Sequence, residues 1–302
     1  MLMKELLQLP APAKINWFLH VTGRRADGYH QLQTLFQCVS LSDSIDLRLR
    51  TDARIERPQG MAGVAPEQDL VVRAARLLQQ HTGCTLGVEI SVTKRIPAGG
   101  GLGGGSSDAA TVLIGLNRLW GLGLSRPQLQ TLGLKLGADV PFFIFGHSAF
   151  AEGLGEELQA LELPERNLWL LDPGVSVPTA AIFQAPELTR NSSPITIQGF
   201  SEAAQRGSME VLLETTRNDL QAVAAERYEK VRQALFWLHT QPPCRHVRMT
   251  GSGGCCFALV EPAAALPANL PSGMRAWQIS TLGRHPLAEW TSFFLSDSSG
   301  KT

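Results

Sequence analysis

The amino-acid sequence predicts an α+β protein of two domains. A chain of 302 residues is long enough for two domains. Segments in which apolar residues alternate stand beside segments with helical spacing, which indicates that strands and helices are mixed along the chain. Residues 146–164 are rich in glycine and end in Leu-Pro. We therefore predict an N-terminal domain over residues 1–160 and a C-terminal domain over residues 161–302.

The predicted N-terminal domain begins with strands and continues with helices. Asp27-Gly28 is a strong turn signal, and it lies in a loop over residues 22–30. Asp69 is in the N-cap position of a predicted helix that ends near Gly83, and Ser125 is in the N-cap position of another, with Gly137 as its C-terminal cap. The predicted elements are strands at 11–21, 32–41, 44–50 and 86–92, and helices at 70–81, from Ser106 or Ser107 through Trp120, and at 126–136.

The predicted C-terminal domain begins with an apolar segment over residues 167–172. A stretch with several prolines follows it, and helices are then predicted near 200–206, 208–216 and 219–240. A second glycine-rich turn, Thr250-Gly-Ser-Gly-Gly254, leads into a buried strand that ends near Val260. The last residues of the chain are expected to be frayed.

A glycine run between a strand and a helix is the most informative stretch of the sequence. Glycine allows a ligand to approach the backbone closely, and the start of a helix offers unpaired N–H groups with a partial positive charge. This combination predicts an anion site, most plausibly for phosphate. Asp108 is expected in the first helical turn. The residues of the run are Pro97, Ala98, Gly99, Gly100, Gly101, Leu102, Gly103, Gly104, Gly105, Ser106 and Ser107.

Three common phosphate-binding templates do not fit this run. A P-loop needs a lysine before its final hydroxyl residue, whereas Gly105 precedes Ser106 and the run has no lysine. A dinucleotide fingerprint needs an acidic residue about 20 positions further on, but residues 109–138 contain neither Asp nor Glu. A protein-kinase loop would require a His-Arg-Asp catalytic loop, which does not occur in the sequence.

Composition excludes several other classes of protein. The 27 basic residues balance 27 acidic residues, which argues against a nucleic-acid partner. No run of 18 apolar residues occurs, so we expect no membrane span. The five cysteines are odd in number and form no CxxC pair, which indicates reduced thiols in a cytoplasmic protein.

Candidate reactive side chains lie outside the glycine run. Lys14 and Asn16 project from the same face of the first strand, although a solvent-facing polar stripe would give the same spacing. Tyr29 and His30 stand at the exit of a loop, where they could stack on a flat ligand or simply pack at a rim. Asp139 precedes an apolar segment, a position that suits a cap, a turn or a catalytic base.

The glycine run closely resembles the phosphate-binding motif of the GHMP small-molecule kinases. Members of this family also have an N-terminal Lys/Asn strand and a late glycine turn, and Lys14-Ile-Asn16 and Thr250–Gly254 match these in the same order. Segments 12–19, 23–30 and 136–141 resemble one branch of the family, in which the acceptor alcohol carries cytidine diphosphate. The resemblance covers residues 10–260 and implies a two-domain kinase with its active site in the cleft between the domains.

The resemblance also implies roles for individual residues. The reaction would transfer the γ-phosphoryl group of ATP to an alcohol, with Mg²⁺ bound mainly by phosphate and water oxygens. Residues 97–107 would hold the triphosphate. The ligand of Mg²⁺ is left unassigned: Ser106 and Ser107 are candidates, with N-capping as the alternative. The remaining implied roles are catalysis by Asp139 as base with Lys14 as its partner, and substrate binding by Asn16, Tyr29, His30 and Phe183.

Two other functions stay open at this point. A different GHMP kinase, acting on homoserine or a sugar, would share the glycine run but not the segment over residues 23–30. A nucleotide-binding protein without catalysis would not need Lys14 and Asp139. We expect a small-molecule substrate, no nucleic-acid or membrane partner, and a monomer or weak homodimer.

Overall fold

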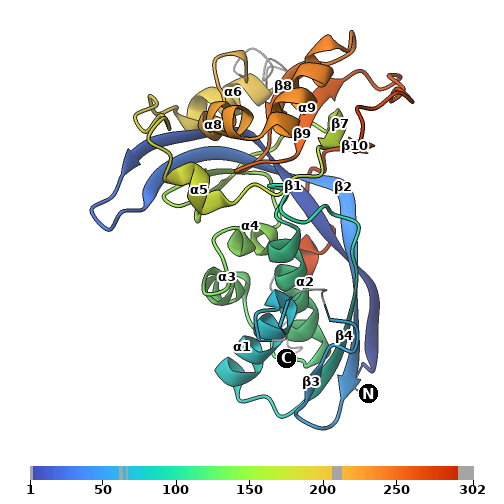
Figure 1. Ribbon diagram of the computed structural model, residues 1–302. Coiled ribbons are helices and arrows are strands. Elements are labelled where there is room, and N and C mark those ends of the chain that lie inside the picture. The colour runs from blue at the N-terminus through green and yellow to red at the C-terminus, as the bar shows by residue number, and fades with distance from the viewer. Residues whose placement is uncertain (1–2, 61–63, 66, 206–212, 292–302) are drawn as a thin grey trace, which may run out of the picture.

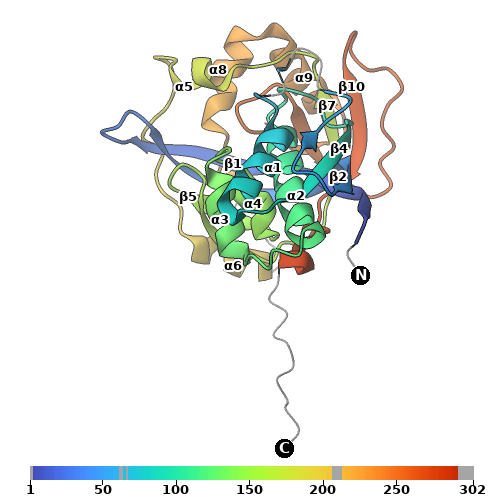
Figure 2. The same ribbon diagram turned by 90° about the horizontal axis from the view of Figure 1, so that it is seen from below.

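Two long strands connect the two lobes of the molecule (Figure 1). The computed structural model describes residues 3–60, 64–65, 67–205 and 213–291. Strand β1 (Glu5–Arg24) pairs antiparallel with β2 (His30–Arg50), from Glu5 opposite Arg48 to Arg24 opposite His30. The turn of this hairpin projects from the body of the molecule (Figure 2).

The first lobe contains a mixed sheet built on β2. Strand β1 occupies one edge of β2, and β4 (Gly87–Thr93) and β5 (Ala149–Glu152) share the other edge. Strands β3 (Ile55–Glu56) and β6 (Glu157–Ala160) complete the sheet in the order β3-β4-β2-β5-β6. The strands predicted separately at 32–41 and 44–50 are one strand, because Asp43 continues the ladder opposite Ala11.

Four helices cover one face of this sheet and enclose its core (Figure 1). Asp69 caps α1 as predicted, by accepting a hydrogen bond from the Val71 N–H, and Gly83 ends that helix with a left-handed φ of 67°. The helices are α1 (Leu70–Thr82), α2 (Gly104–Leu119), α3 (Arg126–Leu134) and α4 (Val140–Phe145).

Two predicted helix caps are wrong. The N-cap of α2 is Gly103, with a φ of 70°, because the glycine loop turns through the left-handed region before the helix begins. Ser106 and Ser107 therefore lie inside the first turn, and Asp108 lies just beyond it. The C-cap of α3 is Lys135 rather than Gly137, because the last turn tightens and ends the helix at Leu134.

The second lobe contains an antiparallel sheet in the order β10-β7-β9-β8, with helices packed against it. The helix predicted over 219–240 is two helices, because Tyr228 takes an extended conformation with φ −124° and ψ 98°. The helix predicted over 208–216 falls largely outside the described residues. The elements are β7 (Asn167–Asp172), β8 (Arg245–Met249), β9 (Cys256–Val260), β10 (Arg275–Ser280), α5 (Thr179–Phe183), α6 (Ile197–Gln205), α8 (Asp219–Arg227), α9 (Glu229–Thr240) and the 3₁₀ helix η1 (Ala288–Thr291).

The chain passes from the first sheet to the second between Ala160, the end of β6, and Asn167, the start of β7. The chain nevertheless returns to the first lobe at its described end, where the Arg126 guanidinium donates a 2.7 Å hydrogen bond to the Ala288 carbonyl. The division into domains at residue 160 thus stays a prediction. In the described part of the chain, every helix is too short or too polar to cross a membrane.

Candidate active site

The glycine loop (residues 97–107) lies between β1 and the second glycine turn (residues 250–254), and hydrogen bonds join it to both sides. The Lys14 N–H donates to the Leu102 carbonyl at 3.0 Å, and the Cys255 N–H donates to the Gly100 carbonyl at 3.1 Å. Gly101 has a φ of 75°, and a Cβ atom there would lie 2.2 Å from the Thr250 carbonyl oxygen. The three segments that carry the family resemblance therefore meet in space, and the close contact explains why glycine is needed.

Lys14 is buried beside the loop and faces Asp139. Its Nζ donates a 2.6 Å hydrogen bond to Asn16 Oδ1 and lies 3.7 Å from Asp139 Oδ2. The side chain of Lys14 is only 4% exposed, whereas that of Asp139 is 37% exposed. Burial lowers the pKa of Lys14, and the charge of Asp139 partly opposes this shift. A solvent-facing polar stripe is therefore excluded for this strand.

Asn16 connects β1, β2 and the second glycine turn. Its Oδ1 accepts the Gly251 N–H at 2.9 Å as well as the ammonium of Lys14, and its Nδ2 donates to Thr34 Oγ1 at 2.8 Å. Its backbone N–H donates to Thr250 Oγ1 at 3.0 Å. The amide thus holds Lys14 in place between the two glycine segments.

These side chains line a central cavity of about 360 Å³. Asp139 enters it from the N-cap position of α4, where its carboxylate makes no capping hydrogen bond. Ser106 from α2 also lines it. The carboxylate and the buried ammonium therefore face the same space as the start of α2.

A second cavity, of about 410 Å³, lies on the other side of the glycine loop. Its lining includes all of Pro97–Ser106 together with Lys94 and the Arg57–Asp69 ion pair. Ser106 lines both this cavity and the central one, whereas Ser107 is completely buried. Of the two serines, Ser106 alone is placed to reach a ligand.

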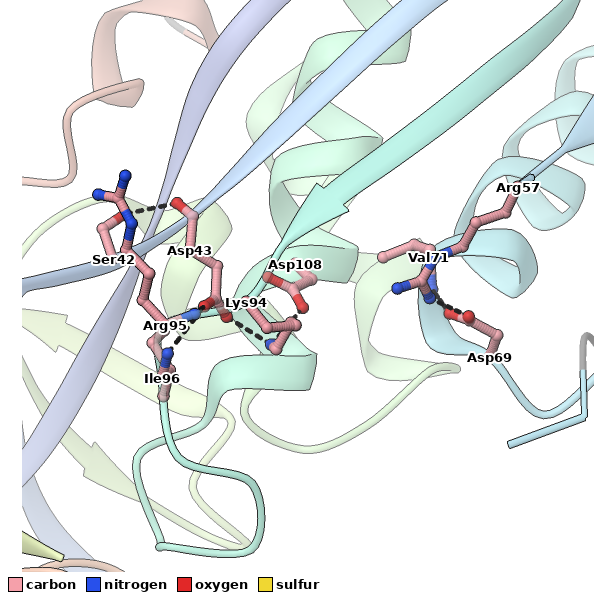
Figure 3. Close-up of polar contacts among 9 residues, drawn as sticks. All are labelled: Ser42, Asp43, Arg57, Asp69, Val71, Lys94, Arg95, Ile96 and Asp108. Atoms are coloured by element: carbon pink, nitrogen blue, oxygen red, sulfur yellow. Dashed lines mark hydrogen bonds and ion pairs between the residues drawn. The ribbon is translucent and has the colours of Figure 1, made fainter. Parts of the chain in front are cut away.

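A network of charges supports both ends of the glycine loop (Figure 3). Asp43 accepts the N–H groups of Arg95 and Ile96 and pairs with Lys94. Lys94 also lies 2.7 Å from Asp108 on α2. Burial raises the pKa of Asp108 to about 7, with the nearby charge of Asp43 acting in the same direction and Lys94 opposing it.

A third cavity, of about 630 Å³, opens next to the central one and shares Leu154, Thr179 and Phe183 with it. The rings of His30 and Phe183 stack there, with centroids 5.2 Å apart and planes at 29°. Tyr29 lines the same cavity and is 63% exposed. The predicted aromatic residues are thus brought together from the hairpin tip and from α5.

Sequence reasoning missed several residues of this site. Thr34 and Phe36 line the central cavity because β2 pairs with β1, and Phe36 lies directly opposite Asn16. Lys94 lies three residues before Pro97, and its position near the loop is the signal that could have marked it. Arg190 lines the third cavity but stands in an irregular proline-containing stretch, where no local pattern marks it.

Comparison with known proteins decides the family. The family of GHMP kinases matches through its N terminal domain at residues 69–147 and through its C terminal domain at residues 200–272. The 4-diphosphocytidyl-2-C-methyl-D-erythritol kinase of Aromatoleum aromaticum is 52% identical over 95% of this chain and 97% of its own. The chain belongs to the 4-diphosphocytidyl-2-C-methyl-D-erythritol kinase branch of the GHMP kinases. It is an ATP-dependent small-molecule kinase with the expected α+β fold.

Other relatives of this GHMP kinase support the same family and fold. The enzyme of the same name from Ralstonia pickettii is 51% identical over 95% of this chain and 97% of its own. A crystal structure of 4-(cytidine 5'-diphospho)-2C-methyl-D-erythritol kinase matches with a TM-score of 0.72 and 34% identity, over 92% of this chain and 98% of that one. Homoserine kinase from Cytophaga hutchinsonii has the same fold, with a TM-score of 0.66 at 14% identity.

Proposed function

We propose that this kinase transfers the γ-phosphoryl group of ATP to the 2-hydroxyl of 4-diphosphocytidyl-2-C-methyl-D-erythritol, in the non-mevalonate route to isoprenoid precursors. The observation that carries the proposal is a row of three connected cavities. The glycine loop separates the first two, the Lys14–Asp139 pair lines the middle one, and an aromatic pair lines the third. Relatives with more than half of their residues identical carry this activity in their names.

Residues 97–107 bind the triphosphate in this proposal. The first N–H groups of α2 have no partner within the helix, and they act together with the partial positive charge at its start. The cavity of about 410 Å³, which Lys94 and the Arg57–Asp69 ion pair also line, accommodates the nucleoside beside the loop. Mg²⁺ would be held mainly by phosphate and water oxygens, because this ion keeps several waters and binds through substrate phosphates in kinase sites. Ser106 Oγ is the protein ligand that we propose.

Asp139 acts as the base in the proposed mechanism. Its carboxylate takes the proton of the acceptor hydroxyl as that oxygen attacks the γ-phosphorus. Lys14 balances the negative charge that gathers on the transferring group, and its burial makes this interaction stronger than it would be in water. Asn16 supports the reaction by fixing the ammonium of Lys14.

The third cavity binds the cytosine ring in this proposal. The stacked rings of His30 and Phe183 form an apolar wall, and the exposed ring of Tyr29 can cover the base. A homoserine or sugar kinase would have no use for an aromatic cavity next to the cavity that Asp139 lines. A purely nucleotide-binding protein would have no use for a buried lysine that faces a carboxylate.

The test is an ADP-release assay with purified protein and MgATP across candidate acceptors. We expect turnover with 4-diphosphocytidyl-2-C-methyl-D-erythritol, and much weaker turnover with 2-C-methyl-D-erythritol 4-phosphate, which lacks the cytidine. Turnover of homoserine or galactose in its place would contradict the proposal. Absence of ADP release with every alcohol, despite ATP binding, would favour the non-catalytic alternative.

We also infer the assembly and location of the enzyme. All five cysteines are free thiols, which supports a reducing cytoplasmic location. The residues proposed for the three cavities all come from one chain, which supports a monomer or weak homodimer. Light scattering at micromolar concentration tests the predicted assembly. A stable oligomer would contradict a monomer or weak homodimer. The division at residue 160 rests on the change of sheet there.

A further inference from the structure

Arg190 lines the third cavity, and the charge of its guanidinium reaches the carboxylate of Glu187. The guanidinium itself donates four hydrogen bonds to neutral acceptors. Nε donates to His30 Nε2 at 3.1 Å, and Nη2 donates to the carbonyls of Phe183 and Ala185 at 3.2 and 2.6 Å. Nη1 donates to the Leu188 carbonyl at 3.0 Å. One side chain therefore joins both members of the aromatic pair.

The bond from Arg190 defines the state of the His30 ring. A histidine nitrogen accepts a hydrogen bond only when it carries no proton. Because Nε2 accepts from a guanidinium that does not deprotonate, the imidazole must be neutral and its proton must be on Nδ1. A protonated His30 would place two N–H donors and a positive charge against Arg190. The contact is incompatible with that form.

The surroundings of His30 favour the same neutral form. Burial lowers the pKa of His30, and the charges of Arg190 and of Arg24 from β1 lower it further. Arg24 does not bond to the ring, because its Nε donates to the Gly28 carbonyl at 3.2 Å. Besides its hydrogen bond from Arg190, the His30 ring stacks on the ring of Phe183.

We propose that Arg190 is a positioning residue of the acceptor site, which holds His30 as the neutral Nδ1–H tautomer and fixes its ring against Phe183. The site then offers a single, constant imidazole donor to a ligand that carries a hydrogen-bond acceptor, such as the carbonyl of a pyrimidine base. This assignment of a ligand rests on the proposed function. The tautomer itself does not, since it follows from contacts within the free protein.

The first experiment measures the tautomer in the free enzyme. Two-bond ¹⁵N–¹H spectra of the full chain labelled with ¹⁵N-histidine distinguish the two neutral forms, and a His30→Gln variant assigns the signal. We expect the Nδ1–H form at pH 7.5, with the midpoint of protonation below the ordinary histidine pKa of about 6.5. An Nε2–H form, or a ring protonated at pH 7, would overturn the proposal without any variant of Arg190 being needed.

Variants separate the hydrogen bond from the charge. Arg190→Met removes both, so the tautomers should mix and the pKa of His30 should rise. Arg24→Met removes only a nearby charge, so the pKa should rise while the Nδ1–H form persists. If both variants changed the tautomer alike, or if neither did, the proposed role of Arg190 would be wrong.

Kinetics then connect the tautomer to the acceptor. Arg190→Met should raise the KM for the cytidine-bearing acceptor by about 10-fold to 100-fold, which corresponds to the loss of one hydrogen bond made by a charged group. The KM for ATP should stay within about 2-fold, because the contacts of Arg190 lie outside the nucleotide cavity. Equal losses for both substrates would contradict a positioning role. If wild-type enzyme did not turn over this acceptor, the proposed function would fail while the spectra still decided the tautomer.

Discussion

Gly101→Ala should damage catalysis far more than it damages folding. Gly101 has a φ of 75°, and a non-glycine residue in that region costs about 1–2 kcal/mol. Its Cβ would also lie 2.2 Å from the Thr250 carbonyl oxygen, well below the 3.0 Å that real Cβ contacts respect. The loop and the second glycine turn would therefore have to separate by about 0.8 Å, and a displacement near 1 Å in a catalytic site can cost about 100-fold in rate.

Gly121→Ala is the matched control for this substitution. Gly121 has a φ of 66°, but a Cβ there would meet nothing within 4 Å. Gly121→Ala should lose about 1–2 kcal/mol in denaturant unfolding from backbone strain, and Gly101→Ala should lose more because its Cβ also clashes with the Thr250 carbonyl. Only Gly101→Ala should lower kcat/KM for ATP, by about 100-fold in an ADP-release assay. Normal kcat/KM in Gly101→Ala, or an equal loss in Gly121→Ala, would refute the reasoning.

Three further predictions concern other parts of the site. Asp139→Asn should lower kcat by about 10²–10⁴-fold, as expected for loss of a general base, while isothermal titration should find ATP binding unchanged. Because the folded-state pKa of Asp108 is raised, its protonated form stabilises the fold at low pH and that contribution is lost as the pH rises towards about 7. Thermal melts should therefore show a smaller loss between pH 5 and pH 8 in Asp108→Asn than in wild type. In the folded protein, Cys84 and Cys244 should react with a thiol reagent before the three buried cysteines do, and the reverse order would contradict the packing.

The local parts of the site could be predicted because each depends on a short pattern. The glycine run places backbone N–H groups at a helix start, and strand alternation places Lys14 beside Asn16. The identity of the cap could not be predicted in the same way. Serine is the usual N-cap, but here Gly103 takes that position because the loop arrives in a left-handed conformation.

The parts that could not be predicted depend on contacts between distant segments. Arg190 meets His30 across 160 positions of sequence, and Lys94 meets Asp43 across 51. No spacing rule reports such a contact. The break at Tyr228 was missed for a related reason, since α8 packs on β1 and α9 packs on β8 and β9, and this packing overrides a continuous helical composition.

The long hairpin of β1 and β2 has a consequence for how the chain acquires its structure. Leu19 bridges to Asn218 and Val39 bridges to Thr281, so both strands of the hairpin find neighbours that are made much later. Contacts this far apart in sequence are expensive in loop entropy and make folding slow. Lys14 lies on the same strand, and it meets the second glycine turn through Asn16. The contacts that fix Lys14 through Asn16 are therefore completed only after the segment that contains Gly251 has been made.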